Sequence, residues 1–260
     1  MFASWMINSW IVCSLVAVVG GAVGFFIVMR GQSFVAHAIP NGSFAGAAGA
    51  SLISVSPLWG LGVFSLLGVC FISLLSRRGR GDVAIALTLV LMLACGALFL
   101  SFSSEYSPAI FSLLFGEVLG VSPNELIPTL AMATICLAAL ATIWRPLLYA
   151  SILPENYGHS KAMGFLFLLM VALATTAAVP VVGTTLIFSL LIGPAATGRN
   201  LTSRPLPALA ISMVLALVIV WLAIGLSFQT NWPIGFFVGS LSALFFGSSL
   251  ALKSMLAKKV

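Results

Sequence analysis

A histidine and an asparagine four residues apart, His37 and Asn41, head a segment of glycine and alanine in the stretch SFVAHAIPNGSFAGAAGA. Side chains at i and i+4 project from one face of a helix, although Pro40 can distort that turn. An imidazole nitrogen and a carboxamide oxygen on one face can ligate a divalent transition metal. Both residues could instead be structural, with His37 capping a helix end and Asn41 bonding a neighbouring helix. The spacing alone leaves both interpretations open.

Three carboxylates gather farther along, Glu105, Glu117 and Glu125, within SFSSEYSPAIFSLLFGEVLGVSPNE. Carboxylates around the mouth of a passage attract cations and raise their local concentration. The alternative is a set of solvated loop carboxylates without a task, because loops normally carry charge.

Enzyme chemistry has little support. The stretch GPAATGRN has the glycine spacing of a phosphate-binding loop, but Arg199 and Asn200 stand where that motif requires Lys and Ser or Thr. No Ser/His/Asp set and no HExxH helix occurs, and the two histidines are His37 and His159. We therefore expect no enzyme and no cofactor on this chain, so any ATP must be hydrolysed by another chain.

The composition predicts the elements that must position these residues. Hydrophobic residues make up 61% of the chain and charged residues 6%, which is too few to cover a soluble core. Apolar runs of roughly 20 residues favour helices that cross the hydrocarbon layer. We expect an all-α, polytopic integral membrane protein with one transmembrane domain over residues 1–260.

Charge clusters and Pro or Gly punctuation divide the chain into nine predicted spans. They begin near Ser9, His37, Leu58, Val83, Leu126, Ala162, Val182, Leu206 and Gly235. With the N-terminus outside and the C-terminus inside, all 11 Lys and Arg residues fall on the inner side, as loop positive charge requires. The three carboxylates then form an outer mouth, and the small side chains after His37 predict a second span in the bundle interior.

At these residues the chain resembles the zinc- and manganese-type permease family of ABC importers. The family follows its first span with Arg, Gly-Asp-x-x-x-His and a small-residue helix, which RGQSFVAHAIPNGSFAGAAG matches in frame. VVGTTLIFSLLIGPAATGRNLTSRP is similar to its Val-Gly-x-Leu-Leu-Val-x-x-Leu-Leu-x-x-Pro-Ala-Ala-Thr-Ala-Arg stretch. FSLLFGEVLGVSPNEL and LSFQTNWPIG resemble two further family segments. The resemblance implies a type II ABC importer-like permease in a bacterial inner membrane.

The resemblance also implies partners. Family members form homodimers, bind two cytoplasmic ATPase subunits that hold the ATP, and receive a cation from an extracytoplasmic binding protein. The connection YASILPENYGHSKAMG resembles the segment that couples the permease to the ATPase. The residues implied in coupling are Pro154, Glu155, Asn156, Tyr157, Gly158 and His159. An ordinary polar loop is the alternative.

The chain departs from the family at the implied metal site. His37 stands at the family's Asp position and Asn41 at its His position, so a carboxylate is missing. Without the carboxylate, the site binds a dication weakly, or the acidic mouth contributes the compensating charge, or the cargo is a less charged chelate. Nitrogen ligation favours zinc over manganese. We expect a metal importer permease with zinc favoured; the rival is a passive channel or assembly subunit that kept the fold without the transport site.

Overall fold

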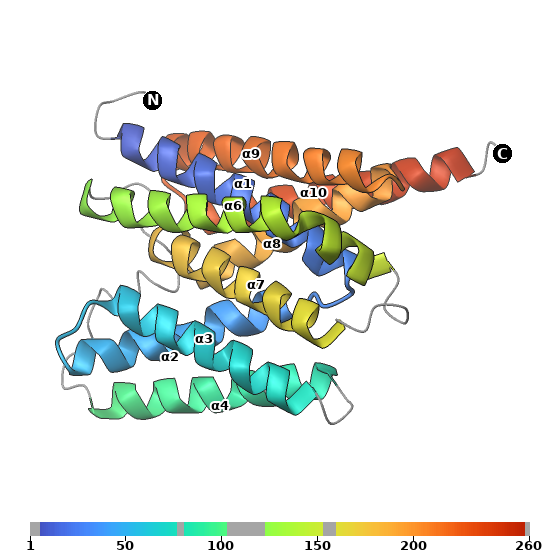
Figure 1. Ribbon diagram of the computed structural model, residues 1–260. Coiled ribbons are helices and arrows are strands. Elements are labelled where there is room, and N and C mark those ends of the chain that lie inside the picture. The colour runs from blue at the N-terminus through green and yellow to red at the C-terminus, as the bar shows by residue number, and fades with distance from the viewer. Residues whose placement is uncertain (1–5, 77–80, 103–122, 153–159, 258–260) are drawn as a thin grey trace.

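The computed structural model describes residues 6–76, 81–102, 123–152 and 160–257, which form helices and no strand (Figure 1). The helices are α1 (Ile7–Met29), α2 (Val35–Leu52), α3 (Pro57–Ser76), α4 (Gly81–Phe102), α6 (Pro123–Ile152), α7 (Ser160–Val182), α8 (Thr184–Leu201), α9 (Pro205–Thr230) and α10 (Ile234–Ala257). The expected all-α class is confirmed.

The helices begin close to the predicted positions. The largest difference is at α6, which starts at Pro123 where Leu126 was expected, three residues later. Seven of the described helices are long and apolar enough to cross a membrane, which confirms a multi-pass membrane protein. The other two are α2 and α8, each 18 residues long. At 1.5 Å per residue each spans about 27 Å, slightly less than the hydrocarbon layer.

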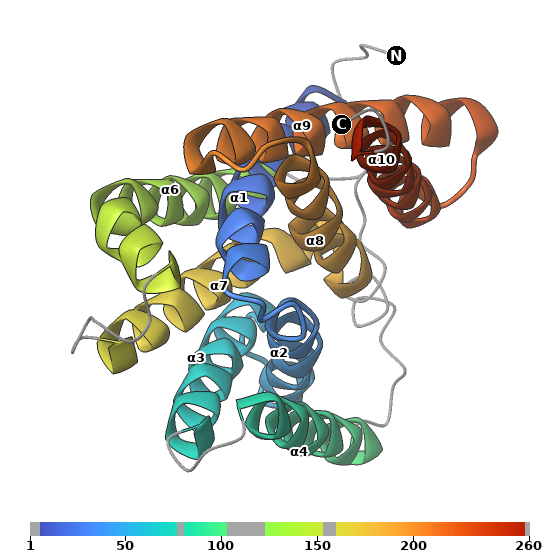
Figure 2. The same ribbon diagram turned by 90° about the vertical axis from the view of Figure 1, so that its right-hand side faces the viewer.

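Helix α1 lies in the middle of the bundle, with α6, α7, α8 and α9 around it (Figure 2). Its side chains from Val12 to Ile27 are mostly buried. On the other side of α7, α2 packs against α3 and α4 and also reaches α7 and α8. Most of α2 is buried, including the run from Gly42 to Ala48, so the prediction that this helix lies within the bundle is confirmed.

Glycine allows the two closest helix contacts. A Cβ on Gly46 of α2 would overlap the carbonyl oxygen of Gly60 on α3, and a Cβ on Gly60 would overlap that of Gly46. A Cβ on Gly24 of α1 would likewise overlap the carbonyl oxygen of Leu191 on α8. Small residues let backbones approach where helices associate within a bilayer. These contacts fix α2 and α8, the two short helices, in the bundle.

Basic residues lie at one end of the bundle. Successive helices run in alternate directions in Figure 1, and the cations sit at corresponding ends. Arg30 is the C-cap of α1, Arg204 is the N-cap of α9, and Arg199 lies in the last turn of α8. Lys161 lies in the first turn of α7 and Lys253 near the end of α10. This arrangement agrees with the predicted inner side, while the orientation in the membrane stays a prediction.

Candidate functional site

The predicted pair lies in the first two turns of α2, and both side chains are half-buried. Asn41 Nδ2 donates to the backbone carbonyl oxygen of His37 at 2.9 Å and lies 3.2 Å from His37 Nδ1. A carbonyl oxygen can only accept, so the atom of Asn41 beside it is the amide nitrogen. His37 Nδ1 therefore faces a donor and accepts from it, which leaves the single proton of a neutral ring on Nε2.

This arrangement differs in detail from the structural alternative considered above. Both hydrogen bonds described for Asn41 stay within α2 rather than reaching a neighbouring helix. The N-cap of α2 is Phe34, which makes no side-chain cap, and His37 follows as the third helical residue. The helix-capping and helix-bridging roles are therefore absent from the described structure, and what remains is a polar pair on one helical face.

Two aromatic rings flank the imidazole. Phe188 of α8 lies with its ring centroid 5.3 Å from that of His37, at an interplanar angle of 73°. Phe34, the N-cap residue of α2, lies 6.1 Å away at 34°. Phe188 belongs to an apolar run, and no feature of the sequence marked it as a neighbour of His37. The crossing of α2 and α8 therefore brings the ring of Phe188 against the imidazole.

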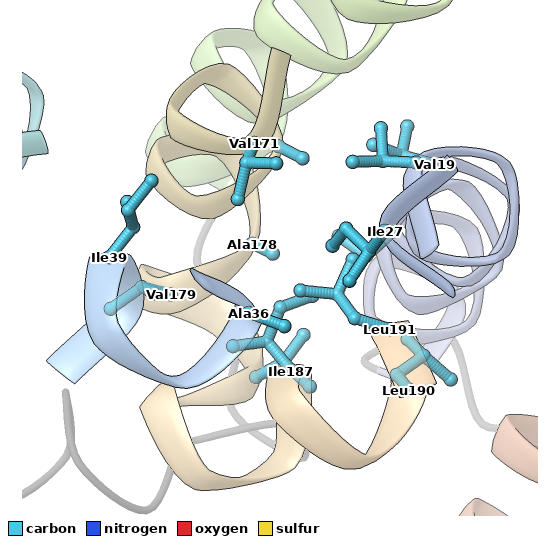
Figure 3. Packing of buried hydrophobic residues seen from close by; sticks show 14 of the residues in the cluster. Val19, Ile27, Ala36, Ile39, Val171, Ala178, Val179, Ile187, Leu190 and Leu191 are labelled. Atoms are coloured by element: carbon cyan, nitrogen blue, oxygen red, sulfur yellow. The ribbon is translucent and has the colours of Figure 1, made fainter. Parts of the chain in front are cut away.

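The apolar contacts around this crossing are visible in Figure 3, where Ala36 of α2 lies beside Ile187 of α8. Ile39 of α2 lies near Val179 of α7 in the same view. All four side chains are buried. The polar pair thus stands next to a closely packed apolar core, which limits how far α2 can shift relative to α7 and α8.

Both short helices have interrupted backbones. Pro40 lies inside α2 and has no N–H to donate to the carbonyl of Ala36, four residues earlier. Ser43 Oγ donates to the Pro40 carbonyl oxygen at 2.7 Å. Helix α8 contains Pro194 and is joined to α7 by Gly183 alone, which has a φ of 78°. Short, Gly- or Pro-interrupted helices mark the substrate sites of many membrane transporters, because their free backbone groups line a cavity.

The described side chains of one chain do not build a complete metal site. No group of three or more His, Cys, Asp or Glu residues stands close enough to hold a metal ion among them. His37 and Asn41 offer at most an imidazole nitrogen and a carboxamide oxygen. A transition metal binding here would need further donors from a second copy, water or another subunit.

The remaining predicted site residues are not tested by the structure. Glu105 and Glu117 lie outside the described residues, as do all six residues of the coupling segment, 154–159. Glu125 falls in the first turn of α6, and its side chain lies outside the described part. The acidic mouth and the ATPase-coupling segment therefore stay predictions.

Comparisons with known proteins agree with the resemblance read from the motifs. The model of the ABC 3 transport family matches residues 3–253. The manganese import system permease protein ScaB of Streptococcus parasanguinis is 28% identical over 245 residues, which is 92% of this chain and 87% of that protein. ScaB of Streptococcus gordonii is 30% identical over 199 residues, 73% of this chain and 70% of its own length.

A solved structure shows the same fold. PsaBC from Streptococcus pneumoniae in complex with Fab superposes with a TM-score of 0.82 at 27% identity, covering 95% of this chain and 91% of the matched one. The family match spans the described helices up to residue 253, within α10. The chain is therefore a member of the ABC 3 transport family.

Proposed function

We propose that this chain is the permease of an ABC importer that carries a divalent transition-metal cation into the cytoplasm. The main support for the proposal is the polar pair His37 and Asn41, which lies where the short helices α2 and α8 cross. The two residues occupy the positions of the family's metal-site motif. Polar side chains at membrane depth are costly and are functional candidates by default. The permease would act with ATPase subunits in the cytoplasm and a binding protein outside.

The two candidate cargoes are manganese and zinc. The relatives compared above carry manganese in their names, which supports manganese for this chain. The donor set supports zinc, because imidazole suits zinc and copper better than it suits manganese, which prefers carboxylate, carbonyl and water oxygens. The expectation of zinc from the sequence has no support from the relatives. We therefore propose the class, a divalent first-row metal, and let the uptake assay rank the two ions.

A homodimer would complete the site. Its two copies of α2 would bring two His37–Asn41 pairs to one passing ion. Neutral donors bind a dication weakly enough to release it, and release is required for conduction. Electrostatic compensation for the dication would then come from outside this pair, with the carboxylates at positions 105, 117 and 125 as the candidates.

The missing carboxylate favours one second candidate, a passive channel or assembly subunit that keeps the fold but not the transport site. A metal chelate with less net charge would also suit an uncharged site. Dependence on ATP separates the importer from a passive channel, and a requirement for an added chelator separates the chelate from the free ion.

The test is metal accumulation in bacterial cells that lack their own manganese and zinc importers. The chain is produced with its ATPase and binding-protein partners, and cellular metal content is measured by mass spectrometry. We expect accumulation of manganese, zinc or both, which disappears when the ATPase is inactivated by substitution. Cells whose metal content stays at the level of the empty vector, with the complex assembled in the membrane, would contradict the proposal.

A further inference from the structure

The hydrogen bonds of Asn41 determine which ring nitrogen of His37 is free. Asn41 Nδ2 lies 2.9 Å from the carbonyl oxygen of His37 and 3.2 Å from Nδ1. Because Nδ1 accepts, a neutral ring carries its proton on Nε2. In this state neither nitrogen offers a free lone pair, since Nδ1 is occupied by the amide and Nε2 is protonated. Without a metal ion, His37 therefore has no free lone pair on either ring nitrogen with which to bind one.

Binding of a metal at Nε2 would require the other tautomer. Nε2 would give its proton to water and Nδ1 would take a proton from water, so the net charge of the ring would not change. A histidine that ligates through one nitrogen donates its other N–H to an oxygen, which fixes the tautomer and the ring orientation. The amide nitrogen of Asn41 cannot accept that proton, but its Oδ1 can.

We propose that Asn41 is a positioning residue whose carboxamide turns over when the ion binds, rather than a ligand of the ion. In the empty state Nδ2 donates to Nδ1 and to the His37 carbonyl. In the loaded state Oδ1 accepts from Nδ1–H, and Nε2 is the ligand. This inference rests on the proposed function and replaces the role of metal ligand that the sequence predicted for Asn41.

The neighbouring side chains favour movement of the carboxamide over movement of the imidazole. Phe188 packs edge-on against the His37 ring at a centroid distance of 5.3 Å, which hinders rotation of the ring. The half-turn of Asn41 gives up its hydrogen bond to the His37 carbonyl and turns Oδ1, a second acceptor, toward that carbonyl oxygen. That lost bond opposes loading, so the ion is released more easily than from a site whose supporting hydrogen bonds are already in place.

Nitrogen NMR of the full-length protein in detergent, labelled in its histidine rings, tests the inference directly. The chain has two histidines, so the signals of His37 are assigned by comparison with His159→Gln. Spectra are recorded at a pH where the ring is neutral, first without metal and then with Zn²⁺ as a diamagnetic probe. We expect the proton on Nε2 in the empty protein, and Zn²⁺ on Nε2 with the proton on Nδ1 after loading.

Three variants separate positioning from a structural role. In Asn41→Asp the carboxylate can only accept, so the empty ring should already carry its proton on Nδ1. In Asn41→Ala no side chain fixes either tautomer, so the empty ring should show both tautomers in exchange. The affinity for Zn²⁺ should not fall, because loading no longer costs the hydrogen bond to the His37 carbonyl. Ser43→Ala is the matched control, because it removes a hydrogen bond of the same helix turn without touching His37, and both readouts should stay unchanged.

The outcomes also separate this inference from the proposed function. A proton on Nδ1 in the empty wild-type protein, or Zn²⁺ on Nδ1 with Nε2–H retained, overturns the role of Asn41 while metal uptake can persist. If Zn²⁺ leaves the signals of both His37 nitrogens unchanged while the protein still accumulates metal, the proposed role of Asn41 is also wrong and the metal site lies elsewhere. Failure of uptake in cells with the tautomer change intact would instead contradict the proposed function.

Discussion

Replacing Gly46 with alanine should weaken the packing of α2, the helix that carries His37. The added Cβ would overlap the carbonyl oxygen of Gly60 and come within 2.6 Å of its carbonyl carbon. Carbon atoms prefer about 3.5–4.0 Å, so α2 and α3 would have to separate by roughly 1 Å. Both contacted atoms belong to the backbone and cannot turn away. Overpacking of this kind costs about 1–3 kcal/mol, offset by at most about 1 kcal/mol of improved helix propensity.

The assay is thermal unfolding of the detergent-solubilised protein, followed by the loss of the monodisperse peak in size-exclusion chromatography. Measured against a Gly→Ala variant that gains the same helix propensity without a clash, the loss of about 1–3 kcal/mol corresponds to a fall of about 2–12 °C, at 2–4 °C per kcal/mol for a chain of this size. Gly247→Ala on α10 is the control, since its Cβ would meet nothing within 4 Å. If Gly46→Ala unfolds at or above the temperature of Gly247→Ala, the backbone contact between α2 and α3 is wrong.

Three further predictions concern other helices and the predicted segments. Ser212→Ala removes a buried 2.7 Å hydrogen bond from α9 to the carbonyl of Gly21 on α1, and should lower stability by about 0.5–2 kcal/mol in the same unfolding assay. Cysteine introduced at Asn231 should react with an impermeant label from outside the cell, and cysteine at Lys253 only after the membrane is opened. Glu155→Ala combined with Gly158→Pro should leave ATP hydrolysis in the purified complex while metal uptake falls, because this segment is predicted to couple the two.

The positions of the helices could be predicted because charged and Pro or Gly residues interrupt the apolar runs. In the sequence, Arg30 follows α1 and Arg77 follows α3, and helix starts agree to within the three-residue difference at α6. The interior place of α2 was also predictable, because Gly and Ala side chains have little to gain from contact with lipid. What composition and pattern determine is therefore where the described helices begin and that α2 lies in the interior.

The partners of individual side chains were not predictable from the sequence. The spacing placed His37 and Asn41 on one face, but it could not show that Asn41 would donate to Nδ1 and so determine the tautomer of the ring. The contact of Phe188 with His37 was not predictable, because it depends on how α2 and α8 pack. Phe188 is also an apolar residue in an apolar run, so the sequence does not distinguish it from its neighbours. The coupling segment and the acidic mouth are predictions that rest on charge and on family resemblance.

The central claim, transport of a divalent metal through the site at His37, is tested most directly in proteoliposomes. The permease is reconstituted with its ATPase subunits and binding protein, and entry of radioactive manganese or zinc is measured with and without ATP. We expect ATP-dependent entry of at least one of the two ions, lost in His37→Ala and retained in Ser43→Ala at equal amounts of assembled complex. Entry at the wild-type rate in His37→Ala, or equal entry without ATP, would contradict the account.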